Sequence, residues 1–88
     1  MGFFDSFLKK ALPHAIRDLD YRVSTRDRSG FTESDFERKL DQIHKSAVQL
    51  DGYEKSEAIH ALHVLESNSR LYPEERRLLG KVLNDLHR

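Results

Sequence analysis

The chain has 88 residues, of which 38% are hydrophobic and 34% charged, and it contains no cysteine. This length suits one small domain, and the lack of cysteine excludes disulfides and cysteine-ligated metal centres. Fifteen basic and fifteen acidic side chains give a formal net charge of zero, which argues against a dedicated nucleic-acid-binding protein. Neither a membrane-spanning apolar run nor a signal-peptide pattern is present, so we expect a cytoplasmic protein.

The charges are unevenly distributed along the chain. Residues 29–68 carry four basic and eight acidic side chains, whereas residues 1–28 and 69–88 each carry two more basic than acidic ones. One interpretation is that basic terminal helices pack on an acidic central hairpin. The other is that an acidic face meets a basic partner. Our candidates for that face are Glu37 and Asp41.

The N-terminal segment, residues 1–12, is predicted to form a short amphipathic helix. Its apolar candidates for binding a partner are Phe3, Phe4, Phe7 and Leu8. Each of these side chains contributes about 1.5–3 kcal/mol when buried, whether in the bundle, in a partner groove or at a lipid surface. The segment is therefore interpreted in three ways: it packs on its own bundle, it binds a partner or a second copy, or it binds a membrane surface.

Residues 13–88 are predicted to form a single helical-bundle domain with loops near 24–31 and 67–72. Pro13 predicts a kink or a new helix start, and the first main helix follows over residues 13–23. The polar connector at residues 24–30 is expected to be a flexible loop.

The central helix, residues 33–50, has the most regular pattern in the chain. Its apolar residues recur at spacings of four and three, which places them on one helical stripe: Phe36, Leu40, Ile43, Ala47 and Leu50. Thr32 and Asp35 are predicted to form a capping box at its start, and Gly52 is expected to end it. The stripe is compatible with packing against a neighbouring helix or against a second copy.

The third helix, residues 53–67, is predicted to begin with a capping box between Asp51 and Glu54. The short turn before it predicts an antiparallel hairpin with the central helix. Its apolar residues cover more than half of the circumference, so we expect it to be the most buried helix. The fourth helix begins at Pro73 and runs to His87, with Glu74 and Glu75 at the positive end of its dipole. The predicted fold is an all-α, small antiparallel bundle of four main helices plus the N-terminal helix.

The spacing of two histidines in the third helix is compatible with a metal site, but their position on the helix argues against one. Glu57, His60 and His63 have a spacing used by carboxylate metal sites in helical bundles. Here His60 and His63 lie with Ser56 on the polar arc of the third helix and are expected to face water, and Glu57 lies toward the edge of that arc. We therefore predict neither a metal nor a cofactor. His44 borders the central stripe, where a boundary residue with one hydrogen bond is more common than a catalyst.

No enzyme signature is present. Ser56 and His60 share a helix face, but an exposed helix supplies no orienting acid and no oxyanion donors. The four glycines are isolated and form no phosphate-binding loop. The leading hypothesis is a non-catalytic protein-interaction module, such as an adaptor, inhibitor or regulatory subunit, that docks through a helical face. The alternatives are a peripheral membrane protein and a metal-binding helical protein, and a homodimer is compatible with each.

Overall fold

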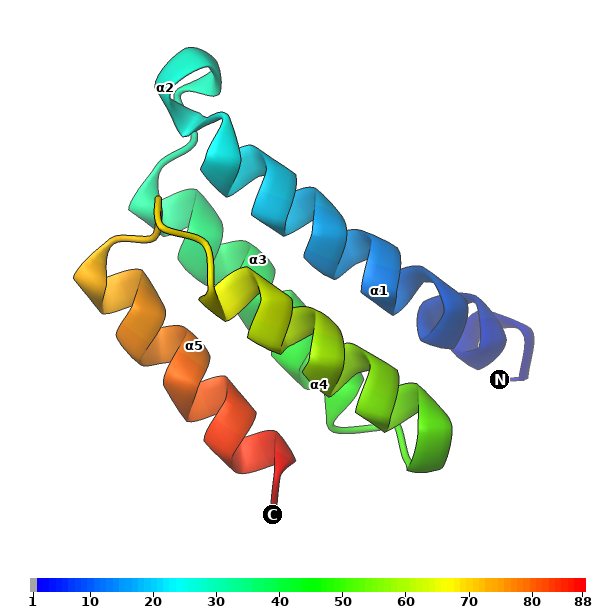
Figure 1. The fold of residues 1–88 in the computed structure, drawn as a ribbon. Coiled ribbons are helices and arrows are strands. Elements are labelled where there is room, and N and C mark those ends of the chain that lie inside the picture. The colour runs from blue at the N-terminus through cyan, green and yellow to red at the C-terminus, as the bar shows by residue number, and fades with distance from the viewer. Residues whose placement is uncertain (1) are drawn as a thin grey trace.

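A computed structural model describes the backbone of residues 2–88 and the side chains of residues 12–88. All regular elements of residues 2–88 are helices: α1 (Gly2–Ser24), α2 (Arg26–Ser29), α3 (Glu33–Ala47), α4 (Gly52–Glu66) and α5 (Pro73–Leu86). They pack against one another as a small bundle, which confirms the predicted fold class (Figure 1). None of these helices is both long enough and apolar enough to cross a lipid bilayer.

The bundle consists of two antiparallel helix pairs that lie face to face. α1 pairs with α3 and α4 pairs with α5, and the closely packed contacts between the pairs are α1 with α4 and α3 with α5. Figure 1 shows α4 in front and α3 behind, with α1 and α5 on either side. The predicted hairpin of α3 with α4 is therefore wrong: these helices run in opposite directions, but both turn their buried faces toward α1 and α5.

α1 continues through Pro13 as one helix, so the N-terminal segment and the first main helix form a single element. Its buried residues on either side of the proline lie on one stripe: Leu12, Ile16, Leu19 and Val23. The candidates Phe3, Phe4, Phe7 and Leu8 lie outside the described side chains, so their role in binding a partner or a membrane stays a prediction.

α3 begins as predicted. The Thr32 hydroxyl accepts a hydrogen bond from the Asp35 backbone N–H at 3.1 Å, and the Asp35 carboxylate accepts one from the Thr32 N–H at 3.1 Å. All five stripe residues from Phe36 to Leu50 are buried. The predicted helix end at Leu50 is wrong, because α3 ends at Ala47. After it, the backbone forms hydrogen bonds between residues three apart instead of four, from the Gln49 N–H to the Ser46 carbonyl and from the Leu50 N–H to the Ala47 carbonyl.

The start of α4 also differs from the prediction. In the described chain the Asp51 side chain makes no capping hydrogen bond, so the predicted box with Glu54 does not form. Gly52 has a φ of 56°, the left-handed conformation in which glycine is favoured, but it is the first residue of α4 rather than a stop after α3. Gly52 therefore turns the chain between the two helix pairs.

Candidate interaction surface

α4 is not the most buried helix, although its sequence is apolar around most of its circumference. Ala58, Leu62 and Leu65 face the core, whereas Tyr53 is 76% and Val64 is 50% exposed. One arc of a helix can face the core of such a bundle, so apolar residues outside that arc remain in solvent. The prediction that this helix is the most buried one was wrong, because its apolar residues lie on two sides of the helix and only one of these sides faces the core.

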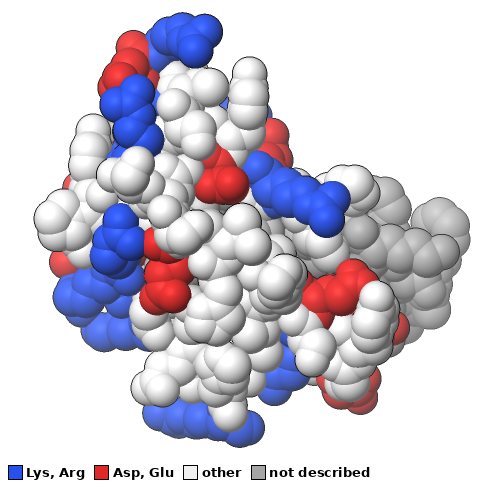
Figure 2. All heavy atoms as spheres, viewed as in Figure 1, with Lys and Arg blue, Asp and Glu red and all other residues white. Residues whose placement is uncertain are grey.

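The exposed side of α4 forms a continuous stripe, which we call the outer face: Tyr53, Ser56, Glu57, His60 and Val64. Spacings of four, three and four residues place Tyr53, Glu57, His60 and Val64 on one side of the helix, and all are exposed. Figure 2, viewed from the side of α4, shows uncharged atoms over much of the centre of the molecule. Acidic and basic groups also lie within this face, between its uncharged areas.

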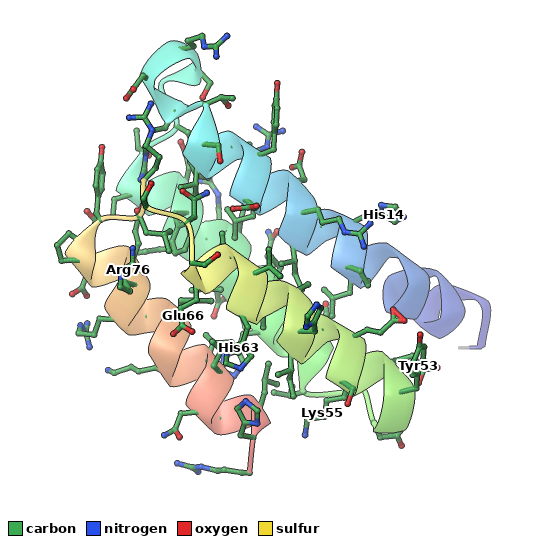
Figure 3. All side chains as sticks on the ribbon, viewed as in Figure 1. His14, Tyr53, Lys55, His63, Glu66 and Arg76 are labelled. Carbon is green, nitrogen blue, oxygen red and sulfur yellow. The ribbon has the colours of Figure 1, made fainter. Side chains whose placement is uncertain are left out.

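The outer face forms the α4 wall of a groove of about 490 Å³ that lies between α4 and α1. Pro13 and Ile16 of α1 and Ala61 of α4 contribute its apolar lining, and Arg17 and Asp20 provide charges on the α1 side. Tyr53 stands at the end of the outer face, as Figure 3 shows. A hydrogen-bonding interaction with the Glu57 carboxylate, together with its negative charge, raises the pKa of Tyr53. The groove and the outer face form one candidate surface for docking.

The candidates Glu37 and Asp41 lie on α3, at a second groove. This groove, of about 350 Å³, is formed by α3 and α5 and includes Lys81 of α5. Asp41 already pairs with Lys45 at 3.0 Å. The structure therefore brings the two acids together at a groove whose opposite side carries a basic residue, rather than on a uniformly acidic face.

His44, also in this second groove, contacts Asp85 of α5 at 2.7 Å. This hydrogen bond is the main reason that the pKa of Asp85 is lowered, and the charge of the imidazole acts in the same direction. The prediction of a boundary histidine with one hydrogen bond is confirmed. The contact links α3 to α5.

The histidines of α4 do not join Glu57 in a metal centre. Glu57 and His60 belong to the outer face, whereas His63 contacts Glu66 at 3.3 Å and His87 at 3.3 Å. Within residues 12–88 no group of three or more histidine or acidic side chains is arranged to hold a metal ion. The expectation that His60 and His63 face water is confirmed.

Arg26, in the connector that was predicted to be a flexible loop, belongs to a buried ion pair with Glu75. Arg26 of α2 is 5% exposed and Glu75 of α5 is fully buried, with guanidinium-to-carboxylate distances of 2.8 and 2.7 Å. The guanidinium also lies 3.9 Å from the centre of the Tyr72 ring and donates to the Arg70 carbonyl at 3.1 Å. Hydrogen bonding to Glu75 raises the pKa of Arg26.

Sequence reasoning assigned Glu75 only to the positive end of the α5 dipole and missed Arg26. Glu75 also accepts a hydrogen bond from the Tyr72 N–H at 2.8 Å, which caps α5. Among the described residues, Arg26 Nε has no hydrogen-bond partner. The enclosed pair joins α2 to α5 and does not face any of the described grooves, so its role is structural.

Comparison of the chain with protein-family models, with curated proteins and with solved structures gives no match.

Proposed function

We propose that the protein is a non-catalytic protein-interaction module whose docking face is the outer face of α4 with its adjoining groove. The observation that supports this proposal is the exposure of Tyr53 and Val64, at 76% and 50%, on a helix that is apolar on more than one side. Tyr53 and Val64 stand at the two ends of the stripe, and both line the groove. Exposed apolar side chains that line a groove are typical of binding surfaces, and tyrosine is enriched at their energetic centres.

The occupant that this face fits best is a second copy of the chain. When two α4 helices pack antiparallel across a two-fold axis, Tyr53 of one copy lies opposite Val64 of the other. The same register places Glu57 opposite His60, because both pairs are centred between residues 58 and 59. Apolar side chains then meet apolar ones, and each carboxylate meets an imidazole that can donate a hydrogen bond. The stripe is thus complementary to itself.

Sedimentation equilibrium over a wide concentration range tests this proposal. The wild-type protein should dimerise, and Val64→Lys should shift it to monomer. Val64 is already half buried in the monomer, so dimerisation buries the other half and contributes about 0.8–1.5 kcal/mol per copy. Two copies then contribute about 1.5–3 kcal/mol, and the affinity should fall by about 10–150-fold. Val48→Lys is the matched control, because Val48 is 51% exposed but lies after the end of α3, away from the outer face.

Charge substitutions test the register. His60→Glu places two acids opposite each other and should weaken the dimer, whereas Glu57→Lys combined with His60→Glu should restore it. A wild-type protein that stays monomeric at every concentration would overturn the second copy as the occupant. Equal dissociation by Val64→Lys and Val48→Lys would overturn the outer face as the docking site.

A further inference from the structure

His63 of α4 and His87 at the end of α5 approach each other through their Nε2 atoms. The Nε2–Nε2 distance is 3.3 Å, whereas the ring centres are 5.6 Å apart and the planes are inclined by 46°. The rings therefore meet at their nitrogen corners rather than stacking. The two residues are 24 positions apart, and the pairing of α4 with α5 brings them together.

Glu66 determines which nitrogen of His63 is available. Its carboxylate lies 3.3 Å from His63 Nδ1, and a carboxylate can only accept, so Nδ1 carries the proton. His63 Nε2 then presents a lone pair toward His87. Arg76 donates to the backbone carbonyl of Glu66 at 2.5 Å, not to its carboxylate, which leaves the carboxylate for His63. Figure 3 shows His63 and Glu66 close together on the α5 side of α4.

We propose that His63 and His87 form a binding site for a borderline divalent transition metal ion such as Zn²⁺, with Glu66 orienting His63. Two nitrogens bound to one tetrahedral Zn²⁺ at 2.0–2.1 Å lie about 3.3–3.4 Å apart, which matches the observed spacing. A carboxylate that accepts from the other ring nitrogen is the usual outer partner of a metal-bound histidine. In the metal-free chain His87 Nε2–H donates to the His63 Nε2 lone pair. When the ion binds, both Nε2 lone pairs are donated to it, the His87 proton is carried on Nδ1 instead, and water completes the coordination.

The site is distinct from the outer face. His60, the histidine of the outer face, lies in the α1–α4 groove and has no part in the His63–His87 contact. A metal ion held by His63 and His87 joins the end of α5 to α4. It should therefore raise the thermal stability of the chain, because the unfolded chain does not hold the two rings together.

Isothermal titration of the untagged full chain with Zn²⁺ tests the proposal, with His63→Gln, His87→Gln and Glu66→Gln as variants. Wild-type protein should bind one ion per chain, and Zn²⁺ should raise its melting temperature. Glu66→Gln should weaken binding by about 10–100-fold, and loss of either histidine should weaken it further. His14→Gln, at an exposed histidine of α1 that belongs neither to the outer face nor to the His63–His87 contact, is the matched control and should bind like wild type. Circular dichroism checks that each variant is folded.

Three results would overturn the site. They are an absence of Zn²⁺ binding by the folded wild-type chain, an equal loss on His14→Gln and His63→Gln, and a stoichiometry of one ion per two chains. Nitrogen-15 spectra of the imidazoles provide a direct readout, because Zn²⁺ should shift the Nε2 resonances of His63 and His87 and leave that of His60 unchanged.

Discussion

Arg26→Met should be among the most destabilising single substitutions in this protein. It keeps much of the apolar stem of Arg26 but leaves Glu75 fully buried, with the Tyr72 N–H as its hydrogen-bond donor within the described chain. Removal of one partner from a buried ion pair costs about 3–5 kcal/mol. A domain of 88 residues has a total stability of about 4–13 kcal/mol at the usual value per residue. The substitution therefore removes a quarter or more of the total.

Urea unfolding followed by circular dichroism measures this loss. Arg22→Met is the matched control, because Arg22 pairs with Asp18 at 2.8 Å but both side chains are about half exposed, and a solvent-exposed ion pair contributes little to stability. Adding Glu75→Gln to Arg26→Met should restore part of the stability, since no buried charge then remains and the amide oxygen can still accept from Tyr72. The reasoning is refuted if Arg26→Met costs no more than Arg22→Met, or if the double variant is less stable than the single one.

Three further substitutions test local features of the fold. Thr32→Ala removes the α3 cap and should lower the free energy of unfolding in urea by about 0.5–2 kcal/mol; an unchanged midpoint would contradict the cap. Gly52→Ala should cost about 1 kcal/mol in the same assay, because its left-handed φ of 56° disfavours a side chain while the space around it is empty. His44→Ala should raise the pKa of Asp85 toward its ordinary value in a carboxyl NMR titration. Because the pKa of Asp85 is lower in the folded chain, its contact with His44 stabilises the protein at pH values above the unfolded pKa of about 3.9. This stabilisation is lost as the pH falls through the folded pKa of Asp85. If His44→Ala leaves the pKa of Asp85 unchanged, His44 is not the cause.

Sequence reasoning succeeded where the determining interactions are local. The Thr32–Asp35 cap spans three residues, and the buried stripe of α3 follows from helical periodicity alone. Both were therefore predictable before any helix was placed in space. The same holds for the fold class, because amphipathic patterns separated by short breaks leave a helical bundle as the way to bury them.

Features that depend on the arrangement of helices were missed. Arg26 and Glu75 are 49 positions apart, and a polar connector offers no signal that one of its arginines is buried. The apolar residues of α4 indicated burial, but which of them face the core depends on where α1 and α5 lie. The prediction of an α3–α4 hairpin was wrong for the same reason, since a short turn fixes the direction of the next helix but not the helix against which it packs.

The pairing of α1 with α3 and of α4 with α5 has a consequence for how the chain folds. Each pair joins neighbours in sequence and can form early, because closing a short loop costs little entropy. The turn around Gly52 then connects two preformed units at one end of the bundle. At the opposite end, Arg26 and Glu75 join those units through contacts distant in sequence. We therefore expect docking of the two units to be the late step in folding. Arg26→Met should then accelerate unfolding far more than it slows folding.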